Sequence, residues 1–310
     1  MNKVSAILLL CTISLQGSAQ MILPATTAHT SATDLNHYWQ AVDSIKATAD
    51  TALQLGYIHR LYIEPASEGL LAFMKNKDNA DRRWLTGIQE QPGFWDSTRK
   101  QMPLVRKAIA MVEANIKHYQ QLYPSLRSST IYFLVGFRQQ GGTIRNNLSL
   151  IGTEVVLRDP EMTADGLLFL CIHEYTHIQQ KRPDFQKINV LTSSIREGAC
   201  DFIAEKVTGK TSKGPYMAYG KAHEQEVWNL FVKDMYTREN DNWVSTGNNP
   251  QLLAPDLGYF VGYRICTAYY RQAKDKPQAI KDIIELDYAD SAAVAHFCQQ
   301  SKYMAQAPRE

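Results

Sequence analysis

The stretch HEYTH, from His173 to His177, places two histidines four residues apart with a glutamate between them. On an α-helix, residues four apart share a face, so both imidazoles can ligate one metal ion. Glu174 lies beside that face and can reach a water molecule at the ion without ligating the ion itself. The pattern predicts a zinc site that hydrolyses a bond. The alternative is two buried histidines whose nitrogens are satisfied by hydrogen bonds.

A catalytic zinc ion usually has three protein ligands, so a third must come from another segment. Glu197 lies on the next expected helix, and antiparallel packing of the two helices would return it to the histidines. Asp201 shares the face of Glu197 and suits the N–H of a ligand imidazole. The alternative for both acids is a solvated acidic face. Cys171 lies about 200° around the helix from His173 and should face away from the ion.

Helical periodicity places these residues on two successive helices. The first is expected over residues 163–181, ending before Pro183, so that both histidines lie on one continuous helix. The second is expected over residues 193–209, with a serine cap at its start and Gly209 at its end. Upstream, residues 129–137 and 148–157 are β-rich and predict two strands of a small sheet.

In these motifs and in several other stretches, the sequence resembles the bacterial predicted zinc-dependent proteases of HExxH type, which are related to gliding-motility-associated lipoproteins. The resemblance runs over nearly the whole chain after the N-terminal segment. The stretches that carry it are FWDSTR (94–99), YFLVGFRQQGGT (132–143), LSLIGTE (148–154), HEYTHIQQ (173–180), IREGACDFIAEKVTG (195–209) and DLGYFVGYRICTAYY (256–270).

The resemblance implies a gluzincin with a bound Zn²⁺ ion. His173, His177 and Glu197 would be the ligands, Glu174 the general base, and Asp201 the hydrogen-bond partner of a ligand. The implied fold is α+β, mainly α, with a zincin-like core in which a small β-sheet lies above the HExxH helix and helical segments flank both.

Cys200 stands where many relatives have alanine or another small residue. We expect it to pack without altering the site.

Hydrolysis of an amide also needs a donor for the tetrahedral oxyanion. The candidates are Tyr259, Tyr263 and His223. Gly258 and Gly262 are four residues apart, so their helix can approach a neighbour closely and present the two tyrosines as an adjacent stripe. The alternatives are a tyrosine-lined core and a histidine exposed on a charged helix.

A strand is the expected substrate platform, because in thermolysin-like enzymes an edge strand above the metal pairs with extended peptide. Gly141–Thr143 would be a flexible turn at its rim. A hairpin that only supports the core is the alternative. The strand residues expected to bind substrate are Leu148, Ser149, Leu150, Ile151 and Gly152.

The N-terminus predicts export. A short positive start, about a dozen apolar residues and the small-residue exit QGSAQ are typical of a secretory signal peptide cleaved after Ala19. The apolar run is too short to span a membrane, and a lipid anchor on Cys11 is the less favoured alternative. The expected organisation is a signal peptide (1–19), a flexible lead-in (20–34) and one zincin-like domain (35–310), comprising a helical part (35–125), the sheet and metal-site helices (126–210) and a second helical part (211–310).

The charge balance excludes one class of partner. The 310-residue chain has a net charge of +2 at pH 7, so it has no general attraction to nucleic acid or anionic lipid. A peptide or protein substrate is favoured, and the oligomeric state is open. Beyond Cys11, four cysteines remain for an oxidising compartment, and the sequence does not select a pairing among Cys171, Cys200, Cys266 and Cys298.

The favoured hypothesis is therefore a secreted or periplasmic zinc metallopeptidase. A second is an envelope assembly or binding protein that keeps the gluzincin scaffold without turnover. A third is a zinc amidase that acts on cell-wall material. The intact Glu174 argues against the second, because a scaffold without turnover has no need of a base.

Overall fold

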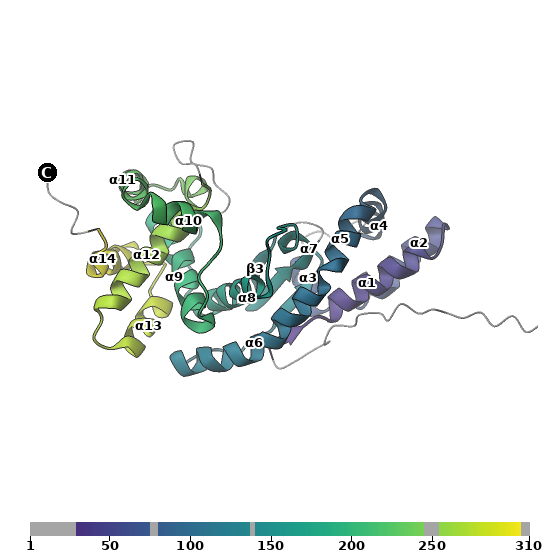
Figure 1. The fold of residues 1–310 in the computed structure, drawn as a ribbon, viewed down its shortest axis with the longest axis horizontal. Helices are drawn as coiled ribbons and strands as arrows, with labels where there is room; N and C mark the ends of the chain where they lie inside the picture. Colours follow the sequence, from purple (N-terminus) through teal and green to yellow (C-terminus); the bar gives the residue numbers. More distant parts are fainter. Residues whose placement is uncertain (1–28, 75–79, 137–139, 245–253, 305–310) are drawn as a thin grey trace, which may run out of the picture.

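The computed structural model describes residues 29–74, 80–136, 140–244 and 254–304. Figure 1 shows an elongated molecule with helices α1 to α6 towards one end, α9 to α14 towards the other, and α8 with the sheet between them. The predicted signal peptide and its cleavage site lie outside the described residues. The N-terminal helices are α1 (Thr33–Lys46), α2 (Thr51–Ile58), the π-helical η1 (His59–Ile63), α3 (Glu68–Phe73), α4 (Ala80–Glu90), α5 (Pro92–Lys100) and α6 (Met102–Leu122).

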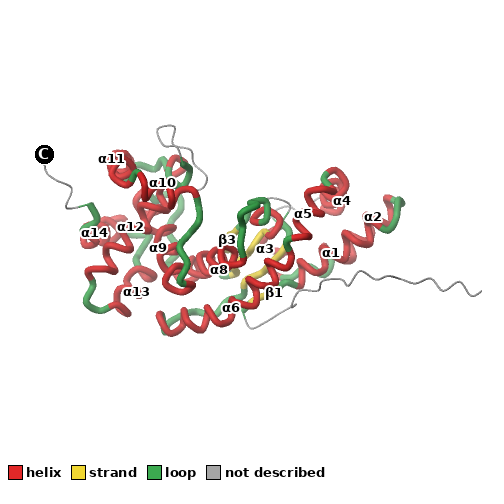
Figure 2. The backbone as a smooth tube through the Cα atoms, viewed as in Figure 1, coloured by secondary structure: helices red, strands yellow, loops and turns green. Residues whose placement is uncertain are grey.

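Four short strands form one sheet that packs against α8 (Ala164–Gln179) (Figure 2). The strands are β1 (Thr30–Ser31), β2 (Ile131–Leu134), β3 (Gly142–Arg145) and β4 (Leu148–Gly152). Their order is β1-β2-β4-β3, with β1–β2 and β2–β4 parallel and β4–β3 antiparallel. Asn146 and Asn147 join β3 to β4 with φ angles of 50° and 62°, which is typical of a type I′ hairpin turn. Within the described residues β3 is an edge strand and β4 is internal.

The sheet differs from the two predicted strands in three places. The strand expected over 148–157 ends at Gly152, and the chain continues as helix α7 (Thr153–Val156). The expected turn at Gly141–Thr143 instead leads into β3. Thr30 and Ser31 belong to the expected flexible lead-in, yet they pair with β2. Parallel pairing joins segments far apart in the chain, so no local pattern indicates it.

An aromatic cluster joins the N-terminal helices to the sheet. The ring centroid of Trp84 lies 5.8 Å from that of Tyr38, and the ring centroid of Trp95 lies 5.1 Å from it. Tyr62 packs edge-on against Tyr38 and donates its hydroxyl to the backbone oxygen of Val135, just beyond β2, at 2.5 Å. Buried aromatic pairs of this kind add specific geometry to apolar burial. The cluster therefore anchors β2, and through it the whole sheet.

The C-terminal elements complete a mainly helical protein, which confirms the expected α+β, mainly α class. Among the described residues, no helix is long and apolar enough to cross a membrane. The four cysteines left unpaired by the sequence are free thiols. These elements are α9 (Val190–Thr208), α10 (Pro215–Ala222), α11 (Glu224–Asp234), the 3-10 helix η2 (Asn240–Asn242), α12 (Leu257–Gln272), α13 (Lys276–Glu285) and α14 (Ser291–Ser301).

The two helices expected to carry the site are both present. Helix α8 is capped by the Thr163 side chain, which accepts from the Gly166 N–H. Helix α9 begins at Val190, earlier than expected, because Asn189 caps it by accepting from the Thr192 N–H. It ends as expected at Gly209, which adopts the left-handed conformation with φ of 67°. The expected serine cap instead lies inside the helix.

Helices α9 and α12 approach backbone to backbone. A Cβ atom added at Gly262 would lie 1.8 Å from the Ser194 oxygen, and one at Gly198 would lie 2.0 Å from the Tyr263 nitrogen. The close approach expected from Gly258 and Gly262 is thereby confirmed, and the neighbour is the helix that carries Glu197. Only glycine fits at such contacts, so α12 sets the position of α9.

We expect Gly262→Ala to lower the free energy of unfolding by about 3 kcal/mol, at the upper end of ordinary overpacking costs. The added methyl group would clash with the Ser194 backbone, which cannot move alone. Urea unfolding followed by circular dichroism measures the change. Gly93→Ala is the matched control, because a Cβ there meets nothing within 4 Å. A Gly262→Ala protein as stable as the wild type would contradict the tight packing of α9 on α12.

Candidate metal centre

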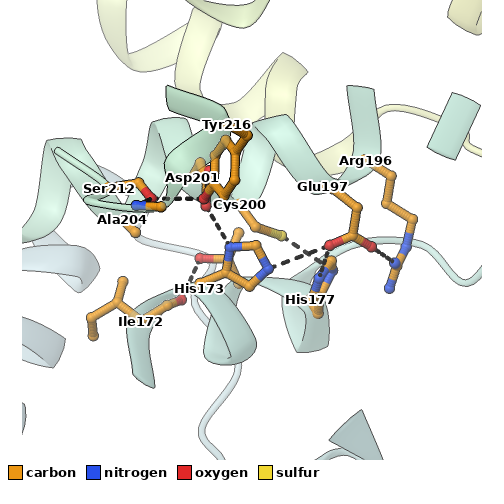
Figure 3. Close-up of polar contacts among 12 residues, drawn as sticks. Ile172, His173, His177, Arg196, Glu197, Cys200, Asp201, Ala204, Ser212 and Tyr216 are labelled. Atoms are coloured by element: carbon orange, nitrogen blue, oxygen red, sulfur yellow. Dashed lines mark hydrogen bonds and ion pairs between the residues drawn. The ribbon is translucent and has the colours of Figure 1, made fainter. Parts of the chain in front are cut away.

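Helix α8 carries His173, Glu174 and His177 without interruption, as the spacing predicts. The two imidazole rings are buried and meet edge to face, with centroids 4.8 Å apart. Helix α9 packs beside α8 and brings Glu197 to the same point (Figure 3). Its Oε2 atom lies 2.9 Å from His177 Nε2 and 3.4 Å from His173 Nε2. Three potential ligand atoms therefore converge from two helices.

The hydrogen bond on the far side of the His173 ring determines which nitrogen faces Glu197 with a lone pair. Asp201 Oδ1 lies 2.8 Å from His173 Nδ1. A carboxylate only accepts, so Nδ1 carries the proton and Nε2 is left to face Glu197. The other Asp201 oxygen accepts from the Tyr216 hydroxyl at 2.8 Å, which fixes the carboxylate in turn. This is the orientation that metal-ligating histidines require.

A second chain of hydrogen bonds sets the tautomer of His177. The Gln180 side-chain N–H₂ donates to the Arg196 backbone oxygen at 2.9 Å, so Gln180 Oε1 must face the His177 ring. This Oε1 atom lies 2.9 Å from His177 Nδ1. Nδ1 must therefore donate, and the Nε2 lone pair of His177 also points at Glu197. Both tautomers are suited to ligation through Nε2.

The donor set fits a zinc ion. Two imidazole lone pairs and a carboxylate oxygen face one another in a buried place, and such groups repel unless a cation lies among them. Two ligands of a tetrahedral zinc ion, each about 2.0–2.1 Å from it, lie about 3.3 Å apart. The distances of 2.9 and 3.4 Å from Glu197 to the two rings are close to that value. Two histidines and one glutamate are also a known catalytic zinc set.

The pKa values of the two rings differ in direction, and that of His173 favours one positive charge at this place. Burial opposes protonation of His173, but its hydrogen bonds to Asp201 and Glu197 outweigh burial and raise its pKa to about 10. Burial, aided by the Arg196 cation, lowers the pKa of His177 to about 4. Without a metal ion, a protonated His173 thus places one positive charge between Asp201 and Glu197.

Cys200 offers a rival third donor. The described residues contain a buried group of His173, His177 and Cys200 whose ligand atoms lie within 4.8 Å of one another. The Cys200 sulfur, however, is 3.1 Å from His177 Nδ1, the nitrogen already committed to Gln180 and on the opposite side of the ring from Glu197. Burial raises the pKa of Cys200 well above its usual range, which disfavours the thiolate that binds metal. Geometry therefore favours Glu197.

Glu174 lies at the mouth of this centre. A Cβ atom added to Gly142 would be 2.4 Å from its Oε1 atom, so the carboxylate rests against the backbone of β3. Burial raises the pKa of Glu174 to about 7, although the nearby His173 opposes the rise. A carboxylate with a pKa near neutrality can both take up and return a proton.

Two cavities meet at the centre. One of about 620 Å³ extends along the first half of α8, and one of about 1040 Å³ extends along β3 and the end of α8. His173, Glu174 and Tyr259 line both cavities. His173, Glu174 and Tyr259 therefore lie where the two cavities adjoin, and His177 and Glu197 line the larger one. The two cavities together are called the cleft.

A family comparison bears on this geometry. The family described as "Predicted Zn-dependent protease (DUF2268)" matches residues 95–290. The chain belongs to this family. The matched part of this predicted Zn-dependent protease contains strands β2 to β4, both site helices and α12, and excludes helices α1 to α4. No curated protein and no solved structure matches the chain.

Of the three expected oxyanion donors, one lies at the candidate metal centre and two lie away from it. The ring of Tyr259 stacks on His173 with centroids 6.0 Å apart, so it lies at the centre. Tyr263 donates its hydroxyl to Glu205 at 2.8 Å and lines neither cavity. His223 stacks on Tyr219 outside both cavities. Tyr259 and Tyr263 are about one helical turn apart on α12, and of the two only Tyr259 lines the cavities.

The expected substrate strand needs correction. Strand β4 is hydrogen-bonded to β2 on one side and to β3 on the other, and most of its residues are buried. It has no free edge for a peptide, and only its first residue, Leu148, is partly exposed. The edge nearest Glu174 belongs to β3. The expected edge strand is therefore an internal strand, and this applies to Leu148, Ser149, Leu150, Ile151 and Gly152.

Sequence reasoning missed three contacts. Tyr216, Gln180 and Arg196 bind Asp201, His177 and Glu197 respectively. Gln180 follows His177 by three residues, a helical spacing that could have indicated the contact. Tyr216 comes from a different helix, and no local signal identifies it. Cys200, expected only to pack, contacts the ring of His177.

Proposed function

We propose that this protein is a zinc-dependent metallopeptidase of gluzincin type. The observation that carries the proposal is the convergence of His173 Nε2, His177 Nε2 and Glu197 Oε2 beside Glu174 in an open cleft. Zinc fits this donor set better than the larger or harder cations, which prefer oxygen ligands. Membership in the predicted Zn-dependent protease family supports the same reaction class.

A bound zinc ion supplies Lewis-acid polarisation of a carbonyl and lowers the pKa of water. Glu174 then takes the proton from the attacking water and passes it to the leaving amine. Its pKa of about 7 suits both transfers. Tyr259 is the proposed donor to the oxyanion, because its ring borders His173 and both cavities. Tyr263 and His223 have no part in the proposal.

Strand β3 replaces β4 as the proposed substrate platform. The Gly152 N–H donates to the Gly141 oxygen at 2.9 Å, which sets the hydrogen-bond phase of the ladder. Alternate residues of an edge strand turn their main-chain groups outwards, so those of Gly142 and Ile144 face away from β4. An extended peptide can add to this edge by main-chain pairing.

The proposal includes export of the protein to the periplasm or the medium. It rests on the signal-peptide pattern of residues 1–19. The proposed substrate is a peptide or protein in that compartment. N-terminal sequencing of the protein after expression with its natural leader should find Gln20 at the start.

The direct test combines metal analysis with peptide digestion. We expect one zinc ion per chain, cleavage of a peptide library, loss of cleavage on chelation and its recovery with added zinc. Zinc without any cleavage would favour the binding-protein hypothesis or an amide in cell-wall material. Absence of zinc after careful supply would overturn the metal site.

Asp201→Ala should weaken zinc binding by about 10- to 100-fold, the usual cost of removing a partner that orients a ligand histidine. His173 would lose the acceptor that keeps its Nε2 lone pair directed at the ion. Competition with a fluorescent chelator measures the affinity. Asp282→Ala is the matched control, because Asp282 binds Tyr269 in another part of the fold. Unchanged zinc affinity in Asp201→Ala would contradict the assigned orientation.

A further inference from the structure

The two halves of the cleft differ in charge. The larger cavity is lined by Arg127, Arg145, Lys181, Arg182 and Arg196. Arg196 is paired with Glu197 and Lys181 with Asp287. Within the described part of the chain, no carboxylate lies within ion-pair distance of the other three arginines.

The acids of the larger cavity do not cancel these three charges. Glu197 is engaged by Arg196 and faces the two histidines, whereas Glu285, which accepts a hydrogen bond from Tyr123, keeps its negative charge. Glu174 lies at the junction, next to the proposed ion. The lining of this cavity therefore carries more positive than negative charge.

The smaller cavity combines apolar side chains with acidic ones, among them Asp159 and Glu161. Phe169 and Leu170 of α8 line it, together with Met162, Pro215 and Tyr216. Its volume of about 620 Å³ accommodates a large side chain with room to spare. Lys210, one of two lysines that line it, is paired with Asp165 at 3.1 Å. This half therefore favours a bulky apolar group.

The register of β3 orients a peptide across both halves. Gly142, at the start of the strand, rests against Glu174, and Arg145, at its end, lines the larger cavity. Antiparallel pairing outnumbers parallel pairing and already joins β3 to β4. All of β3 lines the larger cavity, and Glu174, beside Gly142, lines both cavities. A peptide antiparallel to β3 runs from Arg145 towards Gly142, so its N-terminal part lies in the larger cavity and its C-terminal part continues past Glu174 towards the smaller one.

We propose that the cleft selects peptides with acidic residues on the N-terminal side of the scissile bond and a large apolar residue directly after it. The selection rests on the proposed peptidase function. Arg145 and Arg182 attract the acidic part, and the cavity at Phe169 and Leu170 receives the apolar side chain. The order of the two parts is set by the direction of β3.

The test compares two terminally blocked, fluorescent decapeptides of identical composition. One carries glutamates followed by phenylalanine and leucine, and in the other these blocks are exchanged. Binding is measured by anisotropy with zinc-supplied Glu174→Gln protein, which needs no turnover. We expect the acidic-first peptide to bind about tenfold more tightly, with the difference shrinking at high salt. Equal affinity, or tighter binding of the exchanged peptide, overturns the proposal.

Charge-reversal variants locate the preference. Arg182→Glu and, separately, Arg145→Glu should each weaken binding of the acidic-first peptide by about fivefold. Arg182 is exposed, so its replacement leaves the fold intact even if Arg145→Glu disturbs the hairpin. Lys107→Glu, an exposed change of the same sign on α6 outside both cavities, is the control and should have no effect. An equal loss in the control would overturn the assignment to the cleft.

Digestion by the wild-type protein separates this inference from the proposed function. Cleavage sites in a peptide library should show acidic residues before the bond and Phe, Leu or Met after it. Ordered binding without cleavage of either peptide would refute the peptidase while leaving the peptide orientation supported. Cleavage with no such preference would refute the selectivity while leaving the peptidase supported.

Discussion

Glu174→Gln is expected to reduce the rate of peptide cleavage by about 10³-fold, which lies within the range found for loss of a general acid–base group. Glutamine has nearly the same size but cannot take a proton at neutral pH. Glu174 is not one of the three groups whose ligand atoms converge, so the variant should keep its zinc.

Three measurements decide this prediction together: cleavage rate, zinc content and thermal unfolding. Glu90→Gln on α4 is the matched control, because Glu90 is exposed and lines neither cavity. Its cleavage rate should equal that of the wild type. A Glu174→Gln protein that keeps more than about a tenth of the wild-type rate would exclude Glu174 as the base.

Replacing Glu197 and Cys200 in turn should distinguish the two candidate third ligands. We expect Glu197→Gln to lower zinc affinity by more than 100-fold, beyond the usual effect of an outer hydrogen-bond partner. Cys200→Ser should keep zinc at full stoichiometry, because the sulfur lies on the Nδ1 side of His177, away from the convergence point.

Thermal unfolding adds a second readout of the same pair. Zinc at about 1,000 times its dissociation constant stabilises a protein by about 4 kcal/mol. The wild type and Cys200→Ser should therefore show a clear rise in melting temperature with zinc, and Glu197→Gln should show little. Circular dichroism checks that each variant is folded. The reverse pattern would assign the third ligand to Cys200.

Local periodicity is sufficient to predict the helical half of the site. His173 and His177, like Glu197 and Asp201, are four residues apart, and a 3.6-residue repeat puts each pair on one face regardless of what surrounds it. Burial of both faces is also visible in the flanking apolar residues. The expected close approach at Gly258 and Gly262 follows from the absence of side chains alone.

The sequence also predicted the class of the fold but not the arrangement of its sheet. The apolar run containing β4 looks the same whether it lies inside a sheet or at its edge, because both positions bury alternating side chains. Its place was decided by pairing with β2 and β3. The expectation that β4 is an edge strand was consequently wrong.

The sequence by itself therefore determined the chemistry-bearing types, their helices and their faces. Tertiary structure alone decided which groups complete the site. Tyr216 reaches Asp201 from α10, and Tyr259 reaches His173 from α12, while Tyr263, one turn further along, turns to Glu205. Helical spacing is a property of a few consecutive residues, whereas contacts between helices depend on how distant segments pack, and a single sequence carries no local signal for that packing.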